Sequence, residues 1–251
     1  MNILEEIVAN TRSKLEVRKK EYPLDKIKAE IESSIIEKRS FKNNLVNKKQ
    51  SIIAEIKKAS PSAGIISENF NPIAKAKEYE IFGVSALSVL TEEDYFLGSI
   101  QYLKDIKENT SLPILRKDFI IDTYQIYESK FLGADCILLI VSILSDSQLK
   151  EFSELADNLE LDYLIEVHDE GELKRVELFS NAIIGVNNRN LKTLKVDIQN
   201  SIKLRNLYTK DNVFVAESGI RNQKDIDTLV AQGIHVFLIG ESLMKGDFFE
   251  A

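Results

Sequence analysis

The chain has 251 residues, of which 44% are hydrophobic, and a formal net charge of −7. This length fits one large α/β domain or two small ones, and the negative charge argues against nucleic acid or an anionic membrane surface as a partner. No stretch approaches the roughly 20 apolar residues that span a bilayer, and the acidic start of the chain is unlike a signal peptide. We therefore expect a cytoplasmic protein without a membrane partner.

The segment 1–49 is expected to form a helical extension. Two apolar stripes of helical period occur in it, one of Ile3, Leu4, Ile7, Val8 and Leu15, and one of Leu24, Ile27, Ile31 and Ile35. A separate domain of fewer than about 50 residues is difficult to stabilise. We therefore expect two helices that pack on the rest of one domain, which spans residues 1–251.

From about residue 52 onward the chain repeats one pattern, in which a short apolar run is followed by an amphipathic segment. The apolar runs are Ser51–Ile56, Val84–Leu90, Ile114–Lys117, Cys136–Val141, Tyr163–Val167, Ile183–Asn187, Val213–Glu217 and Val236–Ile239. The segments between them are Ile73–Phe82, Ile100–Glu108, Thr123–Leu132, Asp146–Leu159, Glu170–Leu178, Ile198–Tyr208 and Gln223–Gln232. This alternation is typical of parallel strands joined by helical crossovers.

Eight such runs in about 200 residues predict a closed (β/α)8 TIM barrel, an α/β fold. The alternative is an open doubly wound sheet, which usually has fewer strands and a Gly-rich first turn. Neither GxGxxG nor GxxxxGKS/T occurs in the chain, so the common nucleotide-binding motifs are absent. Gly83, Gly133 and Gly233 stand where helices should end, and Ser145 and Asn222 stand where helices should begin.

Charged and amide side chains stand at the carboxyl ends of five predicted strands, where strands buried on both faces should be apolar. They are Glu55 and Lys57, Lys117, Glu166, Asn187 and Glu217. Catalytic residues of β/α barrels come from these strand ends. The strand period of two directs Glu55 and Lys57 into the barrel mouth and turns Arg116 toward the helices.

Two explanations fit these strand ends: a structural network of ion pairs, or an acid–base site. Lysines and carboxylates from several strands favour the acid–base site, because neighbouring charges in a water-poor cleft push pKa values apart. A metal site is not expected, since His168 and His235 belong to opposite strand ends and no Cys/His ligand spacing occurs. We expect His168 to be a partly exposed loop residue, with a role near Glu166 left open. Cys136 lies in an apolar run and should be buried and inert.

Small residues follow the last two predicted strands, in the segments Glu217–Ile220 and Ile239–Ser242. Such loops expose backbone N–H groups, and they form the usual phosphate position in this fold. The segment Ser60–Gly64 after the first strand offers further donors. Each glycine alone could be a turn former, but together these segments predict a phosphate site. Glu241 fits only if its carboxylate points away from the anion.

Six motifs occur in order along the chain, each at a predicted strand. They are Ile53–Ser62, Pro113–Phe119, Leu164–His168, Gly185–Leu191, Ala216–Ile220 and Leu238–Met244. With the helical front, they make nearly the whole chain resemble the indole-3-glycerol phosphate synthase family of tryptophan biosynthesis.

The resemblance implies a substrate and a reaction. The substrate would be 1-(2-carboxyphenylamino)-1-deoxyribulose 5-phosphate, and ring closure, loss of CO2 and dehydration would give indole-3-glycerol phosphate without a cofactor or metal. By position, Lys117 matches the lysine that protonates the ketone oxygen, and Glu166 matches an acid or base of the later steps. Lys57 matches the lysine near the substrate carboxylate and is a second candidate acid. The resemblance leaves open how the two lysines and the glutamates divide these roles.

Further positions match residues that surround the substrate. The orienting residues would be Glu55, Asn187, Glu217 and Ser218; the phosphate-binding residues would be Ser60, Gly219, Gly240 and the backbone near Glu241. Phe119 and Leu191 match the aromatic pocket, and Arg189 and Leu238 are further substrate-binding candidates within the motifs. A monomer is expected. Two rival functions are disfavoured. Phosphoribosylanthranilate isomerase uses a cysteine and an aspartate rather than two lysines and lacks the long helical front. A barrel that only binds a phosphorylated metabolite would be favoured by loss of Lys117 or Glu166, and both are present.

Overall fold

A closed barrel of parallel strands forms the centre of the computed structural model, which describes residues 2–34, 36–190, 193, 195–246 and 248. Among these residues, eight strands pair in the order β1–β10–β9–β8–β7–β6–β5–β4. They are β1 Ser51–Ile56, β4 Ala86–Leu90, β5 Ile114–Lys117, β6 Cys136–Ile140, β7 Asp162–Val167, β8 Ile183–Asn187, β9 Phe214–Glu217 and β10 Val236–Ile239. Each predicted apolar run contains one strand, so the predicted (β/α)8 barrel is confirmed and the open sheet is wrong.

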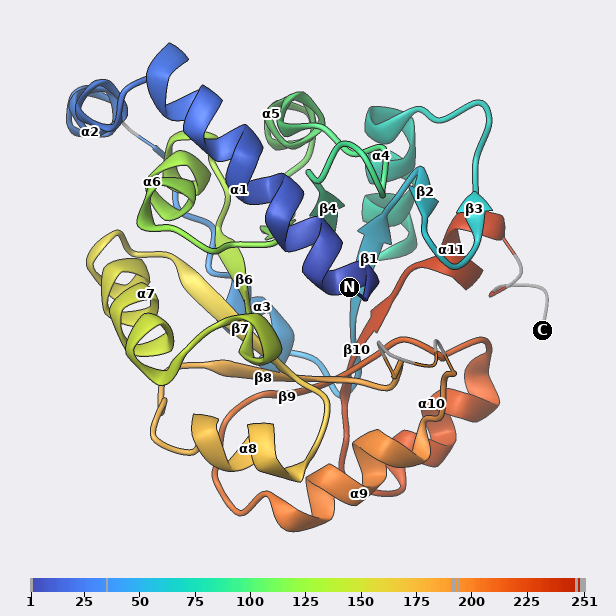
Figure 1. The fold of residues 1–251 in the computed structure, drawn as a ribbon. Helices are drawn as coiled ribbons and strands as arrows, with labels where there is room; N and C mark the ends of the chain where they lie inside the picture. Colours follow the sequence, from blue (N-terminus) through green and yellow to red (C-terminus); the bar gives the residue numbers. More distant parts are fainter. Residues whose placement is uncertain (1, 35, 191–192, 194, 247, 249–251) are drawn as a thin grey trace.

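Helices surround the ring of strands (Figure 1). They are α4 Pro72–Phe82, α5 Ile100–Asn109, α6 Thr123–Phe131, α7 Asp146–Asn158, α8 Glu170–Val176, α9 Gln199–Leu207, α10 Gln223–Val230 and α11 Glu241–Lys245. The predicted caps are confirmed at Ser145, whose side chain accepts from the N–H of Gln148, and at Asn222, which accepts from the N–H of Asp225. Gly83 ends α4 with φ of 85°, a left-handed conformation that glycine adopts without strain.

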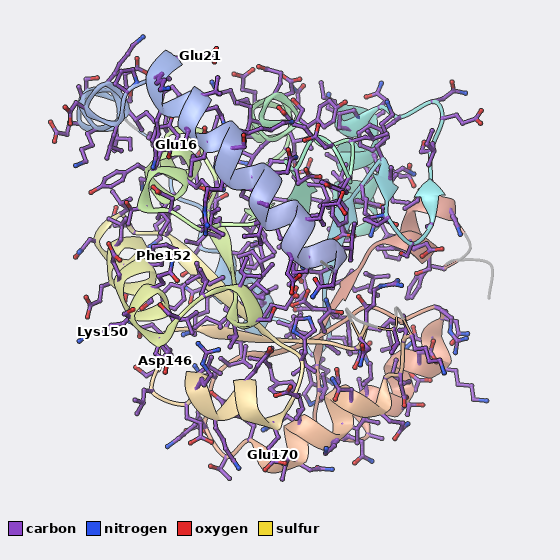
Figure 2. All side chains as sticks on the ribbon, in the orientation of Figure 1. Glu16, Glu21, Asp146, Lys150, Phe152 and Glu170 are labelled. Carbon is purple, nitrogen blue, oxygen red and sulfur yellow. The ribbon has the colours of Figure 1, made fainter. Side chains whose placement is uncertain are left out.

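The alternation of side chains along each strand divides the apolar residues into two clusters. Ala54 and Ile56 of β1 belong to the cluster between strands and helices, whereas Ile53 belongs to the cluster inside the barrel. The helices also have a buried and an exposed face: on α7, Phe152 is buried against the barrel while Lys150 is exposed (Figure 2). Two layers of apolar packing therefore hold the strand ends in fixed positions.

The N-terminal extension contains three helices in the described residues rather than the two that were predicted. They are α1 Ile3–Glu21, α2 Leu24–Ser33 and α3 Phe41–Val46. The additional helix, α3, buries Phe41 and Leu45 in the cluster inside the barrel, and the Ser51 hydroxyl donates to the carbonyl of Leu45 at 2.7 Å. It therefore closes the barrel at the amino ends of the strands. Ile35, which was assigned to the second stripe, lies outside the described residues.

Helix α1 crosses the opposite end of the barrel, and its first turn lies near the middle of the ring (Figure 1). Ion pairs attach α1 to the loop after β4 and to α6: Lys14 Nζ lies 3.0 Å from Glu93 Oε2, and Arg18 Nη1 lies 3.1 Å from Glu128 Oε2. Among the residues that the structure describes, no helix has the length and apolar character needed to cross a membrane.

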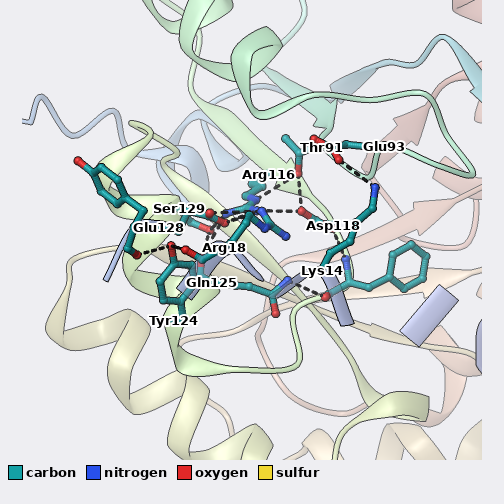
Figure 3. A network of polar contacts seen from close by, with 12 residues as sticks. Lys14, Arg18, Thr91, Glu93, Arg116, Asp118, Tyr124, Gln125, Glu128 and Ser129 are labelled. Carbon is teal, nitrogen blue, oxygen red and sulfur yellow. Dashed lines mark hydrogen bonds and ion pairs between the residues drawn. The ribbon is translucent and has the colours of Figure 1, made fainter. Parts of the chain in front are cut away.

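Arg116 of β5 faces α6, as the alternation predicts, and is fully buried there (Figure 3). Its guanidinium lies 2.9 Å from Asp118 Oδ2 and 2.8 Å from Glu128 Oε2, and it donates to the hydroxyls of Thr91 and Ser129 at 3.1 Å. A buried charge is tolerated only when it is paired and hydrogen-bonded in this way. Since Arg18 also binds Glu128, the network joins α1, α6 and the strand that carries Lys117.

Candidate active site

A cavity of about 680 Å³ lies at the carboxyl ends of the barrel strands. All the described residues that were predicted for the site line it: Glu55, Lys57, Ser60, Lys117, Phe119, Glu166, Asn187, Arg189, Glu217, Ser218, Gly219, Leu238, Gly240 and Glu241. Leu191 lies outside the described residues. Helix α1 adds a wall of Ile3, Leu4 and Ile7 that sequence reasoning did not assign to the site.

Lys117 lies at the centre of the charged part of the cavity. Its Nζ is 3.0 Å from Glu166 Oε2 and 2.9 Å from Glu217 Oε2, so carboxylates from two other strands, β7 and β9, hold one ammonium. Burial disfavours the charged lysine, but the negative charges of Glu166, Glu217 and Glu55 outweigh it and raise the pKa of Lys117. Lys117 is therefore protonated and available as a proton donor.

The two carboxylates beside Lys117 have pKa values shifted in opposite directions. Burial raises the pKa of Glu217 to about 7, because the repulsion from Glu166 adds to burial while the attraction of Lys117 opposes both. Burial acts in the same direction on Glu166, but there the attraction of Lys117 and the contact with His168 prevail and lower the pKa. Two neighbouring carboxylates whose pKa values are shifted in opposite directions are typical of acid–base sites.

Gly185 of β8 leaves the space that the carboxylate of Glu217 occupies. A Cβ atom on Gly185 would lie 2.0 Å from Glu217 Oε1 and 2.6 Å from Leu164 Cδ2. Gly240 plays the same part for the first strand, since a Cβ there would lie 2.4 Å from Glu55 Oε1. Both glycines occur in the predicted motifs, but their packing role depends on strand neighbours and could not be read from spacing.

Lys57, the residue directly after β1, forms an ion pair with Glu55 of that strand, as the shared strand face predicts. On β8, the Asn187 side chain donates to Glu166 Oε1 at 3.2 Å, and its own oxygen accepts from the N–H of Arg189 at 3.0 Å. Two lysines, three carboxylates and an amide are therefore gathered in one cavity, which was the arrangement predicted from the strand ends.

The loops after β9 and β10 meet at the side of the cavity where phosphate was predicted. Ser218 has φ of 65° and Gly219 has φ of 80°. A positive φ at a residue other than glycine is strained and often marks a functional loop. The carboxylate of Glu241 accepts from Lys245 at 2.6 Å, so it is held by its own helix rather than left free. Ser60 and Ser218 add hydroxyls from two further loops of the same cavity.

His168 lies in the loop after β7 and is partly exposed, as predicted, with its side chain 14% exposed. Its Nε2 lies 3.3 Å from Glu166 Oε1 and its Nδ1 lies 3.1 Å from Glu172 Oε2 of α8.

Cys136 is buried inside the barrel, as predicted, and burial raises the pKa of its thiol well above the usual value. Within the described ranges, no group of three or more His, Cys, Asp or Glu side chains could hold a metal ion.

Fold and site together define a β/α-barrel enzyme that carries paired lysines and carboxylates at the carboxyl ends of its strands. The profile of the family "Indole-3-glycerol phosphate synthase" matches residues 4–250. The chain belongs to this family.

Proteins of the same name are similar over nearly their whole length. The one from Ruminiclostridium cellulolyticum is 51% identical over 97% of this chain and 94% of its own length. Those from Endomicrobium trichonymphae and Legionella pneumophila are 48% and 47% identical, each over 95% of its own length and 97% and 98% of this chain. A solved chain from the tryptophan synthase α2β2 complex of Pyrococcus furiosus shares the fold, with a TM-score of 0.56, 15% identity, and coverage of 78% of this chain and 89% of its own.

Proposed function

We propose that the cavity binds 1-(2-carboxyphenylamino)-1-deoxyribulose 5-phosphate and converts it to indole-3-glycerol phosphate, CO2 and water. The protein is a carboxy-lyase of tryptophan biosynthesis by its family. The observation that carries the proposed site is the position of Lys117: its ammonium is held by Glu166 and Glu217 and still faces the cavity.

The first step forms a carbon–carbon bond. The ring carbon that bears the carboxylate attacks the ketone carbon, and the proton of Lys117 passes to the ketone oxygen. A positioned ammonium suits this step, because negative charge develops on that oxygen in the transition state. Release of CO2 leaves its bonding electrons in the ring and restores aromaticity, so the decarboxylation needs no electron sink from the protein.

The second step removes water. A lysine protonates the departing hydroxyl, and a carboxylate takes the proton from the neighbouring carbon, which forms the new double bond of the indole. Lys57 lines the same cavity and Glu166 lies beside Lys117, so both groups are available for this step. With an ionised substrate carboxylate, the whole sequence consumes one proton for each molecule of CO2 released.

The substrate phosphate is assigned to the loops after β9 and β10. Support comes from the left-handed backbone at Ser218 and Gly219, which exposes N–H groups, and from the basic side chains of Arg189 and Lys245 along the same cavity. The apolar wall of α1 and Phe119 suits the aromatic ring of the substrate. The rival isomerase, which uses a cysteine, is disfavoured because Cys136 is fully buried.

The test of this function is the conversion of the carboxyphenylamino-deoxyribulose phosphate by purified protein, without added metal or cofactor. We expect the fluorescence of the indole product to appear. We expect Lys117→Ala to lower turnover by roughly 10²-fold or more, the contribution of a general acid, while binding of the substrate persists. Full turnover by Lys117→Ala would move the first proton transfer to Lys57, and absence of product from the unaltered protein would refute the proposed function.

A further inference from the structure

His168 stands just beyond the carboxyl end of β7, two residues after Glu166, and its imidazole lies between two carboxylates. Nε2 faces Glu166 Oε1 at 3.3 Å, and Nδ1 faces Glu172 Oε2 of α8 at 3.1 Å. The first contact is an ion-pair distance rather than a well-aligned hydrogen bond. His168 does not belong to the lining of the cavity, so it acts on Glu166 from behind.

The surroundings of His168 fix both its backbone and its ring. Glu172 Oε2 also accepts from the backbone N–H of His168 at 2.7 Å, and Asn200 of α9 donates to its carbonyl at 3.0 Å. The charged groups that face the ring are Glu166 on its own strand and Glu172 on α8. Burial disfavours the imidazolium, but the two carboxylates outweigh it and raise the pKa of His168 to about 10. The ring therefore carries a positive charge at neutral pH.

The positive charge of His168 is needed because Lys117 loses its own charge during the reaction and then no longer pairs with Glu166. In the resting site the single positive charge of Lys117 pairs with two buried carboxylates, those of Glu166 and Glu217. When Lys117 passes its proton to the ketone oxygen, it becomes a neutral amine and its attraction for both carboxylates is lost. A buried carboxylate without a cation has a raised pKa, so Glu166 would then compete for the proton instead of waiting for the one released by the substrate.

We propose that His168 is a positioning residue that holds Glu166 ionised and in place while Lys117 is deprotonated. The proton moves from Lys117 Nζ to the ketone oxygen, and His168 keeps both of its ring protons throughout. Glu166 stays free to accept the carbon-bound proton in the later step. Glu172 supports this role by binding Nδ1 on the outer side. The inference rests on the proposed function, since it concerns the site after Lys117 has given its proton to the substrate.

The direct test is His168→Asn, which removes the charge and leaves a polar side chain. We expect kcat to fall about tenfold while KM changes by less than about twofold, because the residue lies outside the cavity lining. We expect the acidic limb of the kcat profile to move to higher pH by about one unit, because Glu166 loses a neighbouring cation. The matched control is His235→Asn: His235 is exposed at the other end of the barrel and is the second of only two histidines.

Glu172→Gln provides an independent variant that keeps the imidazole. Removing one carboxylate should lower the pKa of His168, so the alkaline loss of kcat should begin at lower pH than in the unaltered protein. A merely structural role for His168 would lower the stability of His168→Asn without moving either limb of the profile. Unchanged pH limbs in both variants, or equal kcat in His168→Asn and His235→Asn, would overturn the inference.

A titration of the imidazole nitrogens by NMR separates this inference from the proposed function, because it needs no substrate. We expect His168 to titrate with a pKa of about 10, well above the pKa of about 6.5 of an unperturbed histidine. Glu166→Gln should lower the pKa of His168. An ordinary pKa for His168, or one unaffected by Glu166→Gln, would overturn the contact on which the inference depends. Failure of the unaltered protein to form product would instead refute the proposed function, and the catalytic role of His168 with it.

Discussion

Gly185 has no side chain, and the carboxylate of Glu217 occupies the space that this leaves. Glu217 is buried on β9, and its Oε1 atom lies only 2.0 Å from the point where a Cβ at position 185 would stand. The carboxylate can therefore bind Lys117 through Oε2 at 2.9 Å while its other oxygen is accommodated against the neighbouring strand. The position of the proposed acid thus depends on a residue that carries no functional group.

We expect Gly185→Ala to lower both stability and activity. The new Cβ would lie 2.0 Å from Glu217 Oε1 and must displace that carboxylate, at a cost in the free energy of unfolding of about 1–3 kcal/mol. Loss of the Lys117 contact should lower kcat by roughly tenfold or more. The control is Gly171→Ala in α8, where a Cβ would meet only Asp169 Oδ1, at 3.2 Å. Equal kcat in the two variants, measured by the same assay, would refute this role of Gly185.

Helix α1 and the strand that carries Lys117 are joined by the buried network around Arg116 (Figure 3). Glu128 of α6 is the common partner, since it binds both Arg116 at 2.8 Å and Arg18 of α1 at 3.1 Å. Helix α1 also supplies the apolar wall of the cavity through Ile3 and Ile7. The carboxylate of Glu128 therefore helps to position both the strand that carries Lys117 and the helix that forms the apolar wall.

We expect Glu128→Ala to lower the free energy of unfolding by roughly 3 kcal/mol, because it leaves the fully buried Arg116 with one carboxylate fewer. The control is Glu16→Ala on the exposed side of α1, where the carboxylate lies 3.6 Å from Lys19. An exposed pair of this kind contributes about 0.5 kcal/mol or less. Urea unfolding of both variants measures the difference. Similar midpoints for the two would show that the network contributes little to stability.

The elements that could be predicted are those whose pattern is local. Each barrel strand appears as an apolar run, and the period of two correctly assigned Lys117 to the cavity and Arg116 to the helices. Helix α3 was missed because it has six residues, too few for a helical period to show. The short strands β2 Ala59–Ser60 and β3 Gly64–Ile65 were missed for the same reason.

The parts of the site that could not be predicted depend on distant contacts. The wall formed by α1 is far in sequence from the strands that it covers, and nothing in the period of its apolar residues distinguishes a site-facing side chain from a core one. His168 shows the same limit. Its place beside Glu166 follows from strand alternation, but its second partner, Glu172, lies on the next helix, and the charge of the ring depends on both.

For the whole molecule, the site has consequences for stability as well as catalysis. Glu217 has a pKa of about 7 in the folded protein, above its usual value of 4.5, so the folded state binds the proton more tightly. Its contribution to stability therefore decreases as the pH rises from about 4.5 to about 7. His168 acts in a separate window at higher pH, because its pKa is raised from 6.5 to about 10.

The charge of His168 contributes to the free energy of unfolding. This contribution is fully present below pH 6.5, the pKa of histidine in the unfolded chain, and is lost as the pH rises through about 10. We therefore expect the unaltered protein to exceed His168→Asn in free energy of unfolding at the lower end of this window. The gap should shrink toward the upper end by at least about 1.4 kcal/mol, the equivalent of one pKa unit. Urea unfolding at both ends measures it, and His235→Asn, exposed and outside the site, should follow the unaltered protein throughout. A gap that stays constant across the window would mean that folding does not raise the pKa of His168.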